Sequence, residues 1–516
     1  MLLLRKFFSA EVMISIVFIG VIAFSYAAIR NYADHVRVDY ADVVKKAEAL
    51  AKKPYKPISS EVPPFLQKLT YDQYRDIRFD RSKALWKDLG LAFQIQFLHP
   101  GFIFNKTVTL YETDSRATRR IGFSPSLFDY SKNTFMETMP ETMGYSGFRI
   151  HYPLKKQDYA DEVAVFQGAS YFRAVGKDQN YGLSARGLAI NSGIDGVVEE
   201  FPIFEEFWLQ KPKAGATAIT FYALLNSPSV AGAYEFVVHP DEITQMNVRA
   251  TLFFRKDPGI IGIAPLTSMF WYGENSGTTY GDFRPEVHDS DGLLIQTGAG
   301  EWLWRPLASN PTQTRSFAFK DTNPKGFGLM QRDQNFDHYL DLEAMYHNRP
   351  SAWIEPLNEW GKGEIQLIEL AAPNEINDNI VAFWKPEKSP KKGDRFECAY
   401  KLSWCGRQSQ WPPNGRATST RMSAVPRQPK EKRVIIDFDS KELTSLDASH
   451  PIEAVTSVEG GAAITEEVVQ KNPVDKSWRV SLKIQIQDKN RPIELRCFLK
   501  EGNHILTETW SYLLTP

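Results

Sequence analysis

The chain has 516 residues, with 61 Lys and Arg against 62 Asp and Glu, so its formal net charge is −1. This length predicts roughly two to four domains and leaves ample chain to form a hydrophobic core. The near-neutral charge argues against nucleic acid as a partner, because binding to phosphates requires a basic surface.

The N-terminus has the features of an export segment. Arg5 and Lys6 precede an uncharged apolar run from Val12 to Ile29. This run is either a signal peptide, with a weak cleavage site at Ala27, or an uncleaved anchor, since it is just long enough to span a bilayer. We therefore expect residues 1–38 to be a signal peptide or membrane anchor and the rest of the chain to lie outside the cytoplasm.

One amphipathic helix is predicted soon after this segment. Between Ala41 and Lys53, the apolar residues Val44, Ala47, Leu50 and Ala51 fall on one helical face. β-Strands are predicted to follow for most of the remaining chain.

Alternation of apolar and polar residues predicts these strands. In FQIQFLH (93–99), Phe93, Ile95 and Phe97 alternate with glutamines, and the same logic applies to TVTLYE, AITFYALL, YEFVVH, VRATLFFR and EIQLIEL. Glycine and proline turns separate the strands. The sequence therefore predicts an all-β fold dominated by a large N-terminal β-sandwich.

A charged stretch with two prolines, from Lys385 to Asp394, interrupts the strand pattern. It predicts a first domain over residues 39–388 and a second over residues 391–516. The short strands of the second domain fit a small immunoglobulin-like β-sandwich. Within that domain, residues 415–433 (GRATSTRMSAVPRQPKEKR) are predicted to form a long polar loop.

The three cysteines are predicted to be buried free thiols. They show no zinc-binding spacing. Cys398 and Cys405 lie at an odd offset on an expected strand, so they face opposite sides of it and are poorly placed for a disulfide. Cys497 lies far along the sequence from both.

Two polar clusters in aromatic surroundings are candidate sites. In HDSDG (288–292), the glycine stands at the wrong position for a calcium loop and no further histidines suit zinc, but a hairpin turn, a carboxylate site and a metal site all remain open. In NEINDNIVAFW (374–384), acids precede an apolar strand that ends in tryptophan. That composition suits a sugar cleft, and a solvated turn is the alternative.

Long and unusual motifs then occur together along the chain. They are GASYFRAVGKDQNYGLSARGLAI (168–190), EEFPIFEEFW (199–208), EVHDSDGL (286–293), NPKGFGLMQRDQNFDHY (323–339) and DNIVAFW (378–384). Through them the chain closely resembles the periplasmic glucan biosynthesis proteins of the OpgG/OpgD (MdoG) family from about Asp39 onward. HDSD and FWKPEK look closer to the OpgD branch.

This resemblance implies a fold, a compartment and a substrate. It implies a large N-terminal sandwich of the galactose-mutarotase-like kind followed by an immunoglobulin-like domain, in a periplasmic protein of osmoregulated periplasmic glucan biosynthesis. Family members include inverting β-1,2-glucanases, so the expected partner is β-1,2-glucan and no cofactor or metal is expected. Inner-membrane association through the N-terminal segment and a homodimer are left open.

The resemblance also assigns the two candidate clusters. Matched by motif, Asp378 is expected to be the general acid and Asp289 the general base, which acts through waters and a substrate hydroxyl. Asp291 and Gly292 are expected to shape the turn that presents Asp289. Inverting hydrolysis needs one protonated and one ionised carboxyl, so the environments of the two must differ.

Four further residues in matching motifs are expected to bind sugar or take part in the proton relay: Tyr346, Arg349, Trp353 and Glu375. One departure from the OpgD branch bears on the reaction. The branch has a loop whose tryptophan reaches a neighbouring subunit's cleft, but here the matching residues 416–433 are fewer and include no tryptophan. Three functions stay open: glucan hydrolysis, inverting transglycosylation that cyclises the glucan, and a non-catalytic glucan-binding scaffold.

Overall fold

The computed structural model describes residues 35–58, 62–135, 139–140, 142–276, 281–308, 311–407 and 411–514. The predicted export segment, with its apolar run from Val12 to Ile29, lies outside the described residues. Within the described ranges, no helix combines the length and the hydropathy needed to span a membrane.

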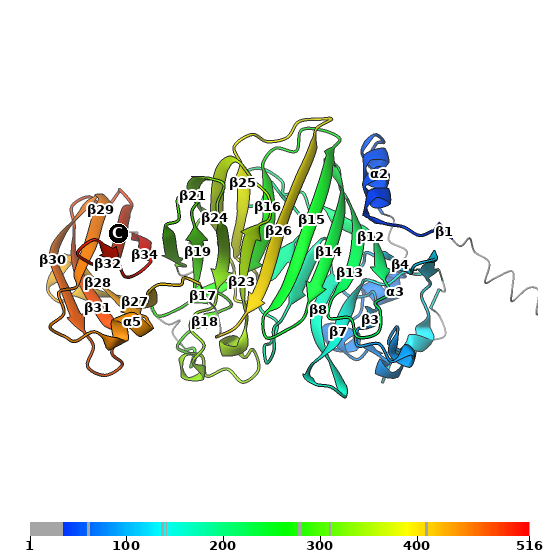
Figure 1. Cartoon of the computed structure of the whole chain (residues 1–516), viewed down its shortest axis with the longest axis horizontal. Coiled ribbons are helices and arrows are strands. Elements are labelled where there is room, and N and C mark those ends of the chain that lie inside the picture. Colours follow the sequence, from blue (N-terminus) through cyan, green and yellow to red (C-terminus); the bar gives the residue numbers. More distant parts are fainter. Residues whose placement is uncertain are drawn as a thin grey trace, which may run out of the picture.

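The all-β prediction is confirmed, and one long sheet extends through most of the molecule (Figure 1). Its strands are, in spatial order, β1 (His35–Val36), β5 (Ala117–Ile121), β4 (Thr109–Thr113), β12 (Ile203–Gln210), β13 (Ile219–Asn226), β14 (Val230–His239), β15 (Thr244–Phe254), β26 (Arg395–Cys405), β23 (Ser351–Pro356), β22 (Gly326–Met330), β19 (Gly292–Gln296), β20 (Trp302–Pro306), β34 (Thr509–Leu514), β32 (Ile493–Glu501) and β29 (Glu453–Gly460), with β33 (His504–Ile505) beside β32.

A second sheet packs against the first part of this long sheet. Its strands are β21 (Arg315–Thr322), β24 (Lys362–Glu369), β25 (Ile380–Pro386), β16 (Ile261–Ser268), β10 (Ser184–Arg186), β9 (Tyr171–Ala174), β8 (Tyr159–Gln167), β7 (Gly147–Lys156) and β3 (Gln94–Leu98), with β11 (Ala189–Ile190) beside β16. Phenylalanines join the two layers: Phe148 lies edge-on to Phe207 and Phe221, with ring centroids 5.1 and 5.6 Å apart. These contacts form the core of the large sandwich.

Short elements complete the large sandwich. They are the helices α2 (Tyr40–Ala51), α3 (Pro64–Gln67) and α4 (Tyr71–Arg75), the two-strand pairs β2 (Arg78–Phe79) with β6 (Phe128–Asp129) and β17 (Phe270–Tyr272) with β18 (Val287–His288), and the 3-10 helices η1 (Arg81–Lys83), η2 (Lys87–Leu89), η3 (Pro125–Leu127), η5 (Phe336–His338) and η6 (Tyr346–Asn348).

Helix α2 is the predicted amphipathic helix, rotated slightly from the expected face. Asp39 caps it by accepting a hydrogen bond from the backbone of Asp42. Its buried residues are Tyr40, Val43 and Ala47, which pack on strands β13 to β15 of the long sheet. Val44 is only half-buried, because Val43 and not Val44 points at the sheet.

The domain boundary predicted between residues 388 and 391 is corrected by strand β26. This strand lies in the middle of the long sheet, where Cys398 pairs with Ala250 of β15 and Trp404 pairs with Ala352 of β23. Its apolar side chains belong to the core of the large sandwich. The polar segment Lys385–Asp394 carries the chain from one sheet to the other, and the second domain begins after Cys405.

The smaller sandwich is made by the end of the long sheet and a separate four-stranded sheet. The latter has the order β27 (Arg416–Val425), β28 (Gln428–Asp439), β31 (Trp478–Ile486) and β30 (Ala462–Lys471), and the helix α5 (Lys441–Ser445) follows β28. The long polar loop predicted over residues 415–433 is therefore wrong, because these residues form most of the β27–β28 hairpin. Few of its side chains are buried, so the apolar alternation that marks a strand is weak.

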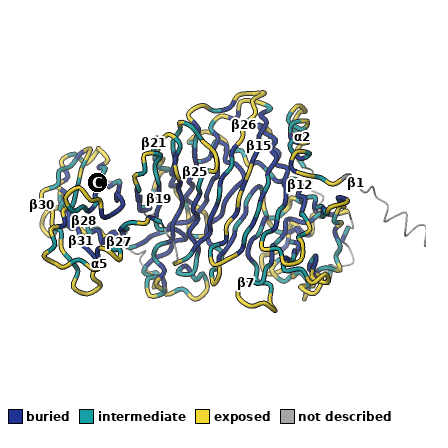
Figure 2. Tube along the Cα trace, viewed as in Figure 1, coloured by how far each residue is buried: buried dark blue, intermediate teal, exposed yellow. Residues whose placement is uncertain are grey.

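The two sandwiches share both a sheet and a core. Strand β20 pairs in parallel with the last strand, β34, so that Leu303 lies beside Thr509 and Trp304 beside Trp510. Figure 2 shows buried chain continuing from β19 toward β28. Trp304 and Trp353 of the large sandwich pack into the same cluster as Trp510. The three cysteines are buried, as predicted, and none of them forms a disulfide.

Candidate functional site

Asp289 stands directly after strand β18, at one end of the second sheet. Its backbone N–H donates to the carbonyl of Met269 over 2.8 Å, which fixes the turn. Its side chain is almost completely buried and forms an ion pair with the Nη1 of Arg349. Arg349 is held in turn, because its Nε donates to the carbonyl of Ala344 over 3.1 Å and its guanidinium stacks on the ring of Tyr346 at 4.3 Å.

Asp378 stands in the loop between β24 and β25, just before β25 begins. The next residue, Asn379, anchors the end of this loop: its side-chain amide exchanges two hydrogen bonds of 2.9 Å with the backbone of Phe270. Since Phe270 is one residue from Met269, which binds Asp289, the two aspartates are fixed to neighbouring backbone positions.

The environment of Asp378 favours its protonated form. The residue is exposed to solvent, and neighbouring protein partly desolvates its carboxyl. This partial desolvation raises the pKa of Asp378, and the charge of Asp289 raises it further, whereas Arg173, Arg186 and Arg349 act in the opposite direction. The two predicted carboxyls are therefore near enough to interact.

The polar face of the second sheet extends from Asp378 across several strands. Arg173 of β9 pairs with Val165 of β8, which pairs with Arg149 of β7, which pairs with Gln96 of β3. Directly paired residues of antiparallel strands point to the same face. Gln96 and Arg149 also line a hollow of about 810 Å³, so Arg173 and this hollow share one face of the sheet.

Asp291 lies at the bend between β18 and β19, but the turn role expected of Gly292 is wrong, because Gly292 is the first residue of strand β19 and pairs with Pro306 and Met330. One carboxylate oxygen of Asp291 accepts hydrogen bonds of 2.9 Å from the backbone N–H groups of Arg332 and Asp333. Burial raises the pKa of Asp291 to about 6. At Gly292, a Cβ atom would lie 2.2 Å from the ring of Trp304, so no larger residue fits without movement.

Trp353 does not join this site. Its side chain is fully buried at the junction of the two sandwiches, where it stacks between Trp302 and Trp411 with centroid distances of 5.5 Å to each. Its strand neighbours Ala352 and Ile354 point to the core of the large sandwich and Trp353 to the opposite side. A buried indole cannot contact a sugar, so its predicted role in sugar binding is corrected to packing.

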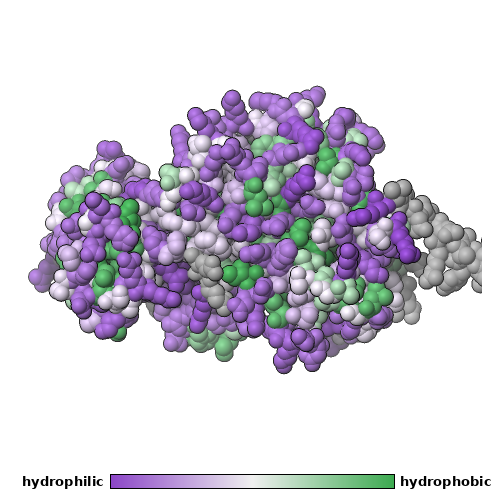
Figure 3. All heavy atoms as spheres, in the orientation of Figure 1, coloured by the Kyte–Doolittle hydropathy of each residue, from purple (hydrophilic) through white to green (hydrophobic). Residues whose placement is uncertain are grey.

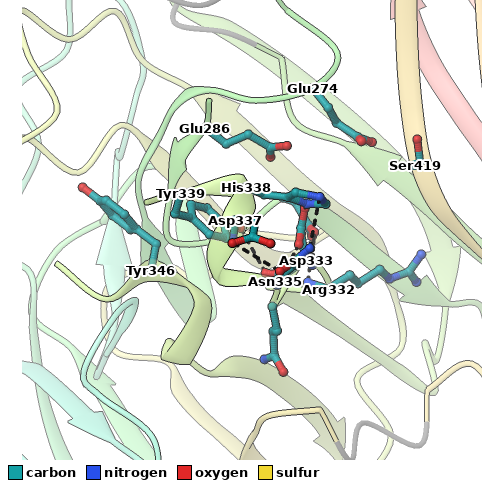
Figure 4. A network of polar contacts seen from close by, with 12 residues as sticks. Glu274, Glu286, Arg332, Asp333, Asn335, Asp337, His338, Tyr339, Tyr346 and Ser419 are labelled. Atoms are coloured by element: carbon teal, nitrogen blue, oxygen red, sulfur yellow. Dashed lines mark hydrogen bonds and ion pairs between the residues drawn. The ribbon is translucent and has the colours of Figure 1, made fainter. Parts of the chain in front are cut away.

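The sequence did not indicate a polar network that includes Glu286, Asp333 and His338 (Figure 4). The network reaches His288, the residue before Asp289. His288 interacts with Glu286 and with Gln331, each over 2.9 Å. Glu286 also approaches Asp333 and His338, and these three offer side-chain atoms within 4.8 Å of one another. Glu286 lies far along the sequence from the other two, so no spacing motif marks the three together.

Glu274 links this network to the second sandwich. It accepts a hydrogen bond from the backbone of Thr420 and forms an ion pair with Arg421 over 2.8 Å, both on β27. Burial raises the pKa of Glu274 to about 7. In Figure 4 it lies on the same side of His338 as Glu286. The β27–β28 hairpin, which stands where a loop was expected, thus contacts Glu274 of its own polypeptide chain.

On the face drawn in Figure 3, no part of the outer surface is a stronger candidate for a functional site than the residues around Asp289 and Asp378. Apolar residues there are scattered among hydrophilic ones, as is usual for a protein surface in contact with water. The site described above is therefore defined by its charged groups and by the polar face of the second sheet.

Comparison with known proteins gives a consistent result. Residues 38–514 match the family model described as "Periplasmic glucan biosynthesis protein, MdoG". The chain is 44% identical over 483 residues to glucans biosynthesis protein G of Ralstonia nicotianae, covering 92% of this chain and 95% of that protein. It is 41% identical over 484 residues to the protein of the same name from Pseudomonas aeruginosa, covering 92% of each.

These relatives carry the name of protein G, so they do not support the predicted closeness to the OpgD branch. The likeness extends over both sandwiches and includes the segments that carry Asp289 and Asp378. The chain therefore belongs to the family of periplasmic glucan biosynthesis proteins.

Proposed function

We propose that this protein acts in the periplasm, in the biosynthesis of osmoregulated periplasmic glucans, by cleaving β-1,2-glucan with inversion at the anomeric carbon. Asp378 is the general acid and Asp289 the general base. The observation that carries the proposal is the contrast between the two carboxyls: Asp378 has a raised pKa, whereas Asp289 is paired with the cationic Arg349. Inverting glycosidases require one protonated and one ionised carboxyl.

The reaction follows from these roles. Asp378 donates its proton to the glycosidic oxygen as the bond from that oxygen to the anomeric carbon breaks. A water molecule attacks the opposite face of the sugar, and its proton passes to Asp289 through a relay of waters and a substrate hydroxyl. Asp378 ends as a carboxylate, Asp289 ends protonated, and exchange with solvent restores both.

Substrate binding is proposed along the polar face of the second sheet. The substrate is a neutral polymer, and its hydroxyl groups can both donate and accept hydrogen bonds. Arg149 and Gln96 offer such partners in the hollow beyond Arg173. Near Asp289, Arg349 and Tyr346 are proposed to contact the sugar that undergoes attack, while Glu375 of the acid-bearing loop is engaged by Arg284.

A second candidate is inverting transglycosylation that cyclises the glucan. It uses the same acid, but a hydroxyl of the glucan replaces the attacking water. The observation that favours it is the β27–β28 hairpin, which contains no tryptophan and contacts Glu274 of its own chain instead of extending as a loop. A non-catalytic glucan-binding scaffold is the remaining alternative.

Incubation of the purified protein with linear β-1,2-glucan, followed by mass spectrometry, separates these functions. New reducing ends indicate hydrolysis, and a product lighter by one water than the linear chain indicates cyclisation. Asp378→Asn and Asp289→Asn should each lower activity by about 10²–10⁴-fold, the usual contribution of a general acid or base. Asp488→Asn, in a turn of the small sandwich, is the control. Folded variants with normal activity would refute the two assignments, and an inactive wild-type protein that binds glucan would favour the scaffold.

A further inference from the structure

One arginine, Arg284, binds three carboxylates near the proposed catalytic pair. Its Nε and Nη2 donate to Asp282 over 3.0 and 2.7 Å, and its Nη1 and Nη2 donate to Glu375 over 3.1 and 2.6 Å. Its Nη1 also donates to Asp341 over 3.1 Å. The Arg284 side chain is 14% exposed, so these charge-assisted bonds are largely shielded from water.

The three carboxylates come from the three segments that carry the site residues. Asp282 lies in the loop that leads through β18 to Asp289. Asp341 lies between η5 and η6, in the segment that continues to Tyr346 and Arg349, and Glu375 lies in the loop that carries Asp378. A single guanidinium therefore joins all three segments.

A chain of contacts leads from Arg284 to the general base. The Oδ1 of Asp341 accepts a hydrogen bond of 2.7 Å from the backbone of Ala344. The carbonyl of Ala344 accepts the Nε of Arg349, and Arg349 forms the ion pair with Asp289. The position of Asp341 thus determines where the guanidinium of Arg349 lies.

A shorter series of contacts leads from Arg284 to the general acid, Asp378. The loop before β25 is largely exposed, and Ile376 at its tip is 87% exposed. Asn379 holds its end on Phe270, and Glu375 holds its other side on Arg284. Asp378 lies between these two anchors. Loss of the Arg284 contact would remove the side-chain anchor that lies three residues before the acid in this loop.

We propose that Arg284 is a positioning residue that sets the geometry of both catalytic carboxyls, through Glu375 for Asp378 and through Asp341 and Arg349 for Asp289. This inference rests on the proposed function. It also assigns Glu375 to the support of the acid-bearing loop instead of to direct sugar binding. Without Arg284, Asp282, Asp341 and Glu375 would repel one another and the three segments would separate.

Steady-state kinetics on linear β-1,2-glucan test the proposal with Arg284→Gln, Arg284→Lys and Arg479→Gln. Arg479 is the matched control, because it also binds a carboxylate through two nitrogens, at Asp437, but lies in the small sandwich. Arg284→Gln should lower kcat by about 10²-fold with little change in KM, since a displacement of about 1 Å can cost that much. Arg284→Lys should recover part of kcat, because lysine keeps the charge without the planar fork.

A double-variant cycle distinguishes positioning from general stability. If Arg284 acts on the acid through Glu375, the kcat loss in Arg284→Gln/Glu375→Gln should be smaller than the product of the two single losses. An unchanged kcat in both Arg284 variants would overturn the proposal. So would a fall of kcat in Arg479→Gln equal to that in Arg284→Gln.

Hydrogen exchange gives a readout that does not depend on turnover. In Arg284→Gln, amides of residues 336–348 and 371–379 should exchange faster than in the wild type, with no change in residues 478–486. Unchanged exchange in both segments would overturn the proposal. If the wild-type protein turns over no glucan, the proposed function fails while the exchange result still decides whether Arg284 holds the segments.

Discussion

Two opposing influences act on the pKa of the Asp378 carboxyl. Partial burial and the nearby charge of Asp289 favour the neutral acid, and the arginines of β9 and β10 favour the carboxylate. The net result is a pKa of Asp378 that lies above the ordinary value for an aspartate. The arginines therefore provide a direct way to move the pH dependence.

Arg173→Gln should shift the alkaline limb of the pH profile of kcat/KM to higher pH. The Arg173 cation lowers the pKa of Asp378, so its removal lets the acid stay protonated to a higher pH. Measurement of kcat/KM on β-1,2-glucan across the pH range checks this, with Arg479→Gln as the control. A limb that stays in place, or moves to lower pH, would contradict it.

Trp353→Ala should destabilise the protein without weakening substrate binding. Its side chain fills the junction between the sandwiches, and loss of a buried tryptophan costs about 3–5 kcal/mol. Denaturant unfolding should show this loss while KM stays within about twofold of the wild type. A raised KM with unchanged stability would instead return Trp353 to the sugar site.

At this scale the sequence indicated the two carboxyls that we propose as acid and base, together with Tyr346 and Arg349, but not Arg284. Asp289 and Asp378 stand in recognisable motifs, and the structure brings both together with Arg349 and Tyr346. Strand alternation shows that Trp353 faces the side opposite to Ala352, but not which side is the cleft. Arg284 carries no sequence signal, because its three partners come from separate segments whose approach depends on the complete fold.

Among the elements, the β27–β28 hairpin joins the small sandwich to the rear of the site. The polar composition of its first strand, β27, conceals that strand from sequence inspection, since few residues of β27 are buried. Backbone pairing of β28 with β31 holds the hairpin in the sheet, although the side chains of β27 do not indicate a strand. The contact with Glu274 makes the docking of this hairpin sensitive to protonation.

Glu274→Gln should reduce the loss of stability as pH rises. The pKa of Glu274 is about 7 in the folded protein, against 4.5 for the ordinary group, so its stabilising contribution is full below about 4.5 and is lost as pH rises through 7. The wild type should therefore lose up to about 3 kcal/mol over this range from this group alone, and the variant should not. Denaturant unfolding at pH 5 and pH 8 tests this; equal losses in both proteins would contradict it.

For the molecule as a whole, the alternation of apolar and polar residues sufficed to predict an all-β fold but not where one sandwich ends. The polar, proline-containing segment Lys385–Asp394 has the composition of a linker, yet it is a crossover between two sheets of one sandwich. Pairing of β26 with β15, about 150 residues earlier, cannot be recognised from local pattern. Long-range pairing of this kind is decided by the whole fold.

Two fragments of the protein distinguish a domain boundary after Cys405 from the boundary predicted between residues 388 and 391. A chain of residues 35–407 keeps β26 in the middle of the long sheet and should unfold cooperatively, although at a lower temperature because Trp304 and Trp353 lose their cover. A chain of residues 35–390 leaves β15 and β23 without their shared partner and should show no cooperative transition. Far-UV circular dichroism during heating measures both, and cooperative unfolding of the shorter fragment would restore the original boundary.

The parallel pairing of β20 with β34 has a consequence for how the chain is made. Ribosomes deliver the N-terminus first, so β20 must wait for β34, about 200 residues later in the chain, before its free side is occupied. Until Thr509–Leu514 arrives, β20 presents unpaired backbone N–H and C=O groups, which can template pairing with another chain. A stop codon placed just before Thr509 should therefore yield protein that aggregates as it folds, even though every residue of the site is still present.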